Sequence, residues 1–337
     1  MKKIIYVLFL LFSNLLISQS FNGPESVEYD SDNNRYFVSN SSNGQILECD
    51  DSGNIISVFV NNVGSGPHGL EYVGGVLYAC SGGRIKGYNS SGVEILNQNL
   101  NANFLNGITH KENDLFITDF SAKRMYRYNT ISGNYNIFCT FSKTPNGTYY
   151  DDINDRLLVV CWGNNAPIYE LSLIDSTYSI LANTNLGNID GIAMDDCGDF
   201  YISPWSSNSI HKFNSDFSSN QIVAPGMSYP ADIYYNRNDN ILVVPNSGNN
   251  TVSFIQKNDC NSTFIFEEND NVIMYPNPVQ NGFILFNKNF VNIKLFNNEG
   301  QLVRFQKIAS NKFNLKGLSK GLYFIDVEGK IKKVIID

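Results

Sequence analysis

The sequence lacks the features that mark several common classes of protein. After residue 20 it has no run of 18 consecutive apolar residues, so no membrane-spanning helix is predicted there. It has no helical periodicity, no phosphate-binding glycine loop, no dinucleotide fingerprint and no Gly-x-Ser-x-Gly nucleophile elbow. Its 337 residues include three histidines, and no pair of its six cysteines has the spacing of zinc ligands. These absences exclude the motif-bearing nucleotide enzymes and zinc-binding folds.

Positive charge is scarce over most of the chain. Residues 21–271 contain 12 Lys and Arg but 28 Asp and Glu, whereas residues 272–337 contain 10 basic and 4 acidic residues. The long acidic part repels phosphate backbones, so no nucleic-acid partner is expected. It is compatible with cation binding and equally with an ordinary solvated surface.

Residues 1–20 have the composition of a secretory signal peptide. Two lysines precede the apolar run Ile4–Leu11, and small residues favour cleavage after Ser20, with Ser18 as the alternative. We therefore expect an exported protein, in which disulfides are permitted. Cys80 and Cys161 lie in apolar strand-like runs and are predicted to be buried free thiols.

A short element recurs six times at intervals of about 40 residues. The copies are centred on Ser26, Gly69, Gly107, Gly147, Gly191 and Asp232. Each copy reads as a strand, a polar turn, a strongly apolar strand, a loop and two further strands, as in Arg35–Ser39 and Phe200–Ser203 for the apolar strand. Four strands per repeat predict an all-β, six-bladed β-propeller over residues 21–268. The alternative is a β-sandwich with accidental spacing.

The repeats resemble a known type. Residues 115–128 (LFITDFSAKRMYRY) resemble an NHL repeat, and residues 40–46 and 246–252 fit the same strand–loop–strand pattern. The resemblance concerns the fold and implies no activity.

Residues 272–337 interrupt the pattern and form the second predicted domain. Tyr275-Pro276-Asn277-Pro278, residues 293–300 (IKLFNNEG), residues 318–324 (LSKGLYF) and a basic end resemble the C-terminal sorting domain of the type IX secretion system. The resemblance implies a small β-sandwich, recognition by that secretion machinery, and a secreted or surface-attached product. An ordinary accessory sandwich is the alternative.

In a propeller, the innermost strands begin around a central axis, so equivalent positions there form a ring. The predicted ring is polar throughout and consists of Glu25, His68, Asn106, Asn146, Asp190 and Asp232, with Ala231 as the alternative at the last position. Carboxylate and amide oxygens suit Ca²⁺, whereas a single His leaves Zn²⁺ short of ligands. Asn-Gly and Asp-Gly are also ordinary turn dipeptides, which is the structural alternative.

The ring resembles that of the SMP-30/gluconolactonase group of calcium-dependent lactonases. The resemblance implies Glu25, Asn146 and Asp190 as metal ligands and Asn106 on the substrate side. Residues 66–69 (GPHG) resemble the paraoxonase element that carries a catalytic His, which implies a role for His68. Two features depart from these families: Phe104 replaces an Arg, and Cys80-Ser81 occupy the place of a second His.

These residues predict a monomeric hydrolase of lactones or esters. The cation would polarise a carbonyl while His68 or Asp190 activates water. Asp232, Trp162 and Trp205 are candidates for substrate contact, although the tryptophans could equally pack between blades. The alternative function is a non-catalytic propeller that binds a protein or glycan at the cell surface. The remaining histidines, His110 and His211, are expected to be structural or exposed, in turns or outer strands.

Overall fold

The computed structural model describes residues 19–257, 274–287, 289–290, 293–327 and 330–336. The chain divides into two compact units, residues 1–261 and 262–337, which are described separately. The predicted signal peptide lies almost wholly outside the described residues, as does Cys260. Within the described part of the chain, no helix is long and apolar enough to cross a membrane.

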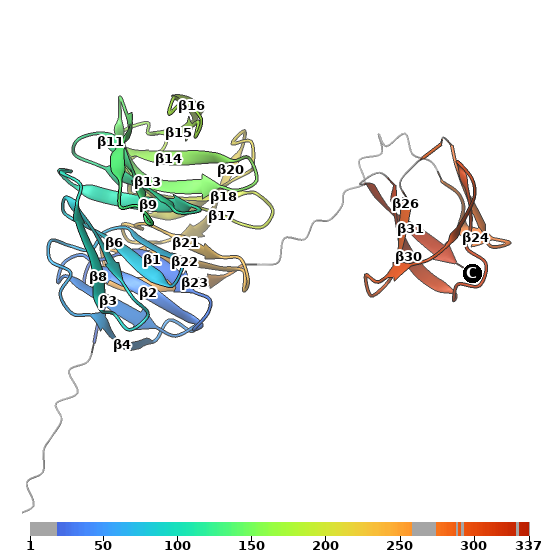
Figure 1. Cartoon of the computed structure of the whole chain (residues 1–337), viewed down its shortest axis with the longest axis horizontal. Helices are drawn as coiled ribbons and strands as arrows, with labels where there is room; N and C mark the ends of the chain where they lie inside the picture. The colour runs from blue at the N-terminus through green and yellow to red at the C-terminus, as the bar shows by residue number, and fades with distance from the viewer. Residues whose placement is uncertain (1–18, 258–273, 288, 291–292, 328–329, 337) are drawn as a thin grey trace, which may run out of the picture. The chain divides into compact units, whose positions relative to one another are not determined.

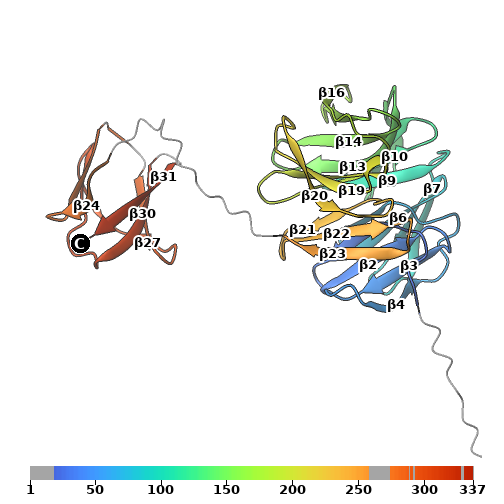
Figure 2. The ribbon, with the colours of Figure 1, turned by 180° about the vertical axis from the view of Figure 1, so that it is seen from behind.

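The first unit consists of six antiparallel sheets arranged around a centre, which confirms the six-bladed propeller (Figures 1 and 2). Blade 1 contains β1 (Pro24–Asp30), β2 (Arg35–Asn40), β3 (Gln45–Cys49) and β4 (Ile55–Val60); blade 2 contains β5 (Leu70–Val73), β6 (Val76–Ser81), β7 (Arg84–Tyr88) and β8 (Glu94–Asn99); blade 3 contains β9 (Leu105–Lys111), β10 (Asp114–Asp119), β11 (Arg124–Asn129) and β12 (Tyr135–Thr140). Blade 4 contains β13 (Thr144–Asp151), β14 (Arg156–Trp162), β15 (Pro167–Leu171) and β16 (Tyr178–Asn183); blade 5 contains β17 (Ile189–Met194), β18 (Phe200–Pro204), the 3₁₀ turn η1 (Trp205–Ser207), β19 (Ser209–Phe213) and β20 (Asn220–Pro225); blade 6 contains β21 (Tyr234–Asn236), β22 (Ile241–Asn246) and β23 (Thr251–Gln256).

Polar turns connect the first and second strands of a blade and stabilise the hairpin between them. In blade 1, Asp30 accepts hydrogen bonds from the backbone of the following turn and forms an ion pair with Arg35 at 2.9 Å. In blade 4, Asp151 and Arg156 repeat this arrangement at 2.7 Å. An Asp side chain that bonds the backbone two or three residues later favours a tight turn. The second strand that follows is apolar and buried, so it forms the middle of each blade.

Blades 6 and 1 close the ring through side chains and backbone. The described strands of every blade are consecutive in sequence, so blade 6 contributes no strand to blade 1. Instead Asn236 Nδ2 donates to the Tyr36 hydroxyl at 2.7 Å, and the ring of Tyr36 meets Phe254 edge-on with centroids 5.1 Å apart. Closure therefore depends on packing at the interface between blades 6 and 1. We call this interface the seam.

The two cysteines that were predicted to be buried thiols do pack as small apolar residues. Cys80 and Cys161 are buried free thiols, which confirms that prediction, and Cys49 and Cys139 are also free. Cys197 is disulfide-bonded. Burial raises the pKa of Cys161 to about 12, so its thiol is not reactive at neutral pH.

The second unit is an all-β module with its own apolar core. Its strands are β24 (Met274–Gln280), β25 (Phe283–Phe286), β26 (Ile293–Asn297), β27 (Leu302–Val303), β28 (Gln306–Ala309), β29 (Lys312–Asn314), β30 (Gly321–Val327) and β31 (Lys330–Ile336). They pair in the order β27-β26-β30-β31-β24-β25-β29-β28, a curled sheet whose two halves enclose residues such as Phe286, Leu295 and Ile325.

Candidate functional site

In blades 1, 3, 4 and 5 the innermost strand begins with a β-bulge that contains the predicted ring residue. The register between the first two strands shifts within residues 24–27 of blade 1, 145–148 of blade 4 and 189–192 of blade 5. Glu25, Asn146 and Asp190 lie within these bulges. A bulge leaves one residue without a partner in the ladder and re-aims its side chain. In these blades the bulge thus releases one side chain from regular pairing.

Contacts between blades define which positions are equivalent. The amide of Gly69 donates to the Asn106 carbonyl at 2.9 Å, and the amide of Asp232 makes the same kind of bond to Glu25 at 2.8 Å. Asp232 is therefore equivalent to the glycines, and the preceding residue, Ala231, occupies the sixth ring position. The alternative register considered from the sequence is the one observed.

The glycines that follow the ring residues permit close approach of neighbouring blades. A Cβ added to Gly69, Gly107 or Gly147 would lie 2.2–2.4 Å from the ring residue's carbonyl oxygen in the next blade. At the seam the equivalent residues are Ser26 and Asp232, and Ser26 Oγ donates to Asp232 Oδ2 at 2.8 Å. The seam therefore carries polar side chains at the positions that glycine occupies in blades 2 to 5.

Three carboxyl groups lie close enough at this centre to perturb one another. Burial raises the pKa of Glu25 well above its usual value, and Asp190 and Asp232 raise it further. Burial and Asp232 likewise raise the pKa of Asp190, although the Trp205 indole and the Asn146 amide oppose the rise. Burial raises the pKa of Asp232 to about 7, and the Ser26 hydroxyl partly offsets this effect. The arrangement concentrates acidic groups, and no basic side chain contributes to these pKa shifts.

Several buried polar atoms of this centre have no hydrogen-bond partner among the described residues. They are Glu25 Oε2, Asp190 Oδ1, His68 Nδ1 and Trp205 Nε1. Glu25 and Asp190 are 7% and 4% exposed. The Trp205 indole lies near enough to Asp190 to lower its pKa. Trp205 Nε1 and Asp190 Oδ1 nevertheless do not form a hydrogen bond. Buried carboxylate oxygens normally have partners, so unpaired ones suit a cation or bound water.

The two ring amides are bonded to each other. Asn106 Nδ2 donates to Asn146 Oδ1 at 2.5 Å, and Asn146 Nδ2 donates to the Ile189 carbonyl at 3.1 Å. The orientation of Asn146 leaves one lone pair of its Oδ1 for a further partner. In the described residues, no three His, Cys, Asp or Glu side chains form a metal-binding group. A cation here would therefore need the Asn146 oxygen together with Glu25 and Asp190, a donor set that suits Ca²⁺.

His68 is a neutral, half-buried imidazole. Burial lowers its pKa to about 4, and no carboxyl group contributes to the shift. The ring packs edge-on against Phe104, with centroids 4.6 Å apart. His68 is therefore not paired with Asp190 in the structure. It can accept a proton at neutral pH, because its free form predominates there.

Aromatic side chains from blades 2 to 6 form a continuous arc that begins at His68. Beyond Phe104, successive centroid distances of 5.8, 5.9, 5.1 and 4.9 Å connect Phe104, Phe120, Trp162, Trp205 and Tyr229. The two tryptophans predicted to contact substrate thus touch each other edge-on. Sequence reasoning missed Phe120 and Tyr229, although both flank the repeat elements at corresponding strand ends. We call this set the aromatic arc.

The remaining histidines have different surroundings. His211 is buried on β19 and contacts Ser207 and Asn220, which agrees with a structural role. His110 does not lie in a turn or an outer strand as expected: it is on β9, an innermost strand, and its Nδ1 pairs with Glu71 Oε1 at 2.5 Å. The partner is 39 residues away on β5, so no local signal in the sequence indicated the pair.

Comparisons with known proteins agree with the two-part organisation. Residues 273–337 match the family described as the secretion system C-terminal sorting domain. No curated protein sequence matches the chain. Among solved structures, a gluconolactonase from Xanthomonas campestris shares 15% identity with a TM-score of 0.57, covering 67% of this chain and 83% of its own.

Two further structures show the same fold. Streptogramin B lyase shares 16% identity with a TM-score of 0.55, covering 72% of this chain and 85% of its own. A chain of a nidogen/laminin complex shares 15% identity with a TM-score of 0.54, covering 66% and 92%. Likeness at this level shows fold and not activity. The chain is thus a six-bladed β-propeller joined to a type IX secretion C-terminal sorting domain, which marks it for export across the outer membrane to a secreted or surface-attached state.

Proposed function

We propose that the exported propeller binds Ca²⁺ at Glu25, Asn146 and Asp190 and hydrolyses a lactone or ester beside it. The observation that carries the proposal is the pair of unpartnered, buried oxygens, Glu25 Oε2 and Asp190 Oδ1, in a centre without an offsetting basic group. The gluconolactonase among the structural neighbours supports it as an analogy of fold.

The residues around these oxygens suggest how hydrolysis would proceed. A bound cation would supply polarisation of the substrate carbonyl. His68, neutral at pH 7, accepts a proton from the attacking water and returns it to the leaving alcohol oxygen as the acyl C–O bond breaks. Asn106, held by Asn146, and the aromatic arc would contact the substrate, and the arc favours one with an apolar or ring-bearing body.

A calcium-binding experiment on the full mature chain tests the metal part. Ca²⁺ should raise the melting temperature, because a ligand of the native state stabilises it by mass action. Glu25→Gln and Asp190→Asn should each abolish the shift, whereas Asp51→Asn on the exposed surface should preserve it. An unchanged melting temperature at millimolar Ca²⁺, or a shift that survives both variants, would contradict the assignment.

Hydrolysis needs a separate assay. The full chain should open members of a panel of aromatic and aliphatic lactones, and excess chelator should remove that activity. His68→Gln should lower kcat by at least 100-fold while leaving the Ca²⁺-induced melting shift intact. Calcium binding without turnover of any member would reject the enzyme and retain the cation site.

The second candidate is a non-catalytic binding propeller at the cell surface. Phe104 favours it, because the lactonase pattern has an Arg at this position and Phe104 instead packs between His68 and Phe120. This candidate expects a retained protein or glycan ligand and no turnover.

A further inference from the structure

A cavity lies along the innermost strands, beyond the ring residues. Its volume is about 650 Å³. It is lined by the residues three positions after each ring residue, namely Glu28, Glu71, Thr109, Tyr149, Ala193 and Tyr234. Asp232, which the sequence predicted as part of the central ring, also lines this cavity. A cavity of this size can enclose a small organic molecule.

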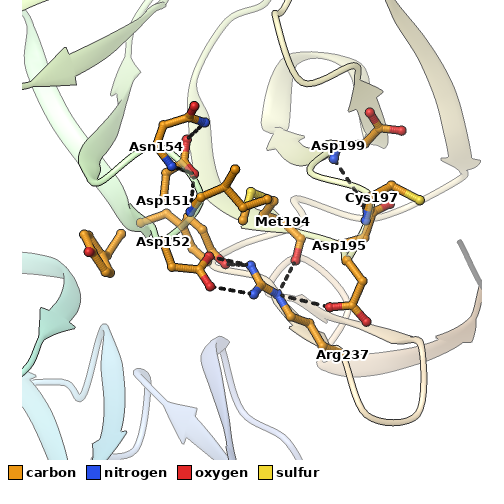
Figure 3. Close-up of polar contacts among 12 residues, drawn as sticks. Asp151, Asp152, Asn154, Met194, Asp195, Cys197, Asp199 and Arg237 are labelled. Atoms are coloured by element: carbon orange, nitrogen blue, oxygen red, sulfur yellow. Dashed lines mark hydrogen bonds and ion pairs between the residues drawn. The ribbon is translucent and has the colours of Figure 1, made fainter. Parts of the chain in front are cut away.

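The basic groups of this cavity already have acidic partners. Arg237 forms two contacts with Asp152, at 3.1 and 3.0 Å, and donates to the Tyr149 hydroxyl at 2.8 Å (Figure 3). His110 is paired with Glu71 as described above. Neither cation is therefore available to the other acids that line the cavity.

Of the lining acids without a basic partner among the described residues, Asp32 is exposed, whereas Glu28 and Asp232 are half-buried. They interact with each other and with Glu71, and this repulsion adds to burial in raising the pKa of Glu28 well above its usual value. Asp232 has the Ser26 hydroxyl as its partner, which carries no charge. Beyond Asp232, toward the ring, Glu25 holds the buried and unpartnered Oε2. The inner end of the cavity therefore holds acidic groups without a basic partner, and a bound cation would favour their charged form.

Tyrosines supply much of the wall. Tyr29, Tyr72, Tyr150 and Tyr235 line the cavity in addition to Tyr149 and Tyr234. Aromatic faces attract cations and pack against apolar groups, and the attraction grows when water is displaced. Carboxylates at one end and tyrosines along the sides are complementary to a molecule with an ammonium head and an apolar body.

We propose that this cavity is a binding site for a small organic ammonium compound, whose charged nitrogen lies between Glu28 and Asp232 and whose body packs against the tyrosines. The site adjoins the proposed calcium centre at Asp232 but has its own lining and a different ligand. Anions are excluded by the charge of Glu28, Glu71 and Asp232, and neutral molecules of equal shape lose the ionic part of the interaction.

Three probes of matched size test the proposal by titration calorimetry on the full chain at pH 8 in excess EDTA. They are phenethylamine, 2-phenylethanol and phenylacetate. Phenethylamine should bind at least ten-fold more tightly than the alcohol, and phenylacetate should not bind. Glu28→Gln should weaken phenethylamine at least ten-fold and leave the alcohol unchanged, while Glu112→Gln on the exposed surface should alter neither.

Equal affinity for amine and alcohol, absence of any binding, or amine binding that survives Glu28→Gln would overturn the proposal. Should Glu28→Gln fail to fold by circular dichroism, Asp232→Asn provides the same comparison. Because chelator is present throughout, the result is independent of the calcium experiment, and either proposal can fail alone.

Discussion

At the scale of single residues, the seam position of Asp232 distinguishes it from its counterparts. The equivalent residue is glycine in blades 2 to 5, where the next blade's carbonyl excludes a side chain. Beside blade 1, Asp232 has room, a hydroxyl partner in Ser26 and acidic neighbours. Its carboxyl group is therefore held where the charged form is disfavoured.

This placement predicts a pH dependence of stability. The pKa of Asp232 is about 7 in the folded protein against an ordinary 3.8, so the folded state binds the proton more tightly. The resulting stabilisation is present at low pH and is lost as the pH rises through about 7. In EDTA, the free energy of unfolding of the parent protein should fall relative to Asp232→Asn between about pH 4 and 7. Urea unfolding across this range checks it, and parallel curves for the two proteins would contradict it.

Other groups titrate in both proteins and cancel in that comparison. His68 has the opposite sign, because its pKa is lowered to about 4 and its contribution to stability is lost as the pH falls below its ordinary 6.5. Glu25 and Asp190 share the sign of Asp232. Because Asp232 raises the pKa of both groups, their coupling to it would enlarge the difference between the two proteins.

At the scale of elements, hydroxyl groups join neighbouring blades at every second interface. Ser39, Thr118 and Ser203, each on the second strand of its blade, accept an amide hydrogen bond from the first strand and donate to a ring-position carbonyl of the next blade. For Thr118 the two distances are 2.8 and 2.7 Å. Each hydroxyl thus connects strand pairing within a blade to packing between blades.

Replacing Thr118 by valine keeps the shape and removes both bonds. The Gly107 amide and the Asn146 carbonyl would lose a buried partner, so the free energy of unfolding should fall by about 1–3 kcal/mol. Thr140→Val, at an exposed position on β12, should change it by less than about 0.5 kcal/mol. Equal effects of the two substitutions in denaturant titrations would show that the bridge contributes little.

The repeat allowed the strands to be predicted from the sequence, whereas the contacts between blades could be predicted only in part. Apolar second strands such as Arg35–Asn40 carry a strong local pattern, and the polar turns beside them mark their ends. The choice between Ala231 and Asp232 depends on a bond to Glu25, more than 200 residues away. Likewise the Glu71–His110 pair and the aromatic arc arise from side chains of different blades, which no window of sequence contains.

At the scale of the whole molecule, the two units differ in charge and have separate cores. The propeller side is strongly acidic and the C-terminal part is basic. The core of the second unit consists of residues from β24 onward, including Val279, Phe313 and Val334. Cores that share no residue are expected to unfold independently.

Removing the second unit tests this independence. A mature chain ending at Asn261 should melt within about 2 °C of the propeller transition in the full chain, since no propeller core residue is lost. In the producing cell the same truncation should abolish export across the outer membrane, because the matched sorting domain is gone. Differential scanning calorimetry and cell fractionation check the two parts. A large drop in melting temperature would show that the units stabilise each other.

The seam also has a mechanical consequence for a protein anchored to a surface. A pull on the C-terminal module is transmitted first to blade 6, which is held to blade 1 by noncovalent contacts such as Asn236 to Tyr36. Tension would therefore separate blade 6 from blade 1 at the seam before it disturbs the other blade interfaces. Such parting would hydrate Asp232 and Ser26 first, so a tethered molecule under shear would lose its buried acidic centre while most of its sheets stayed folded.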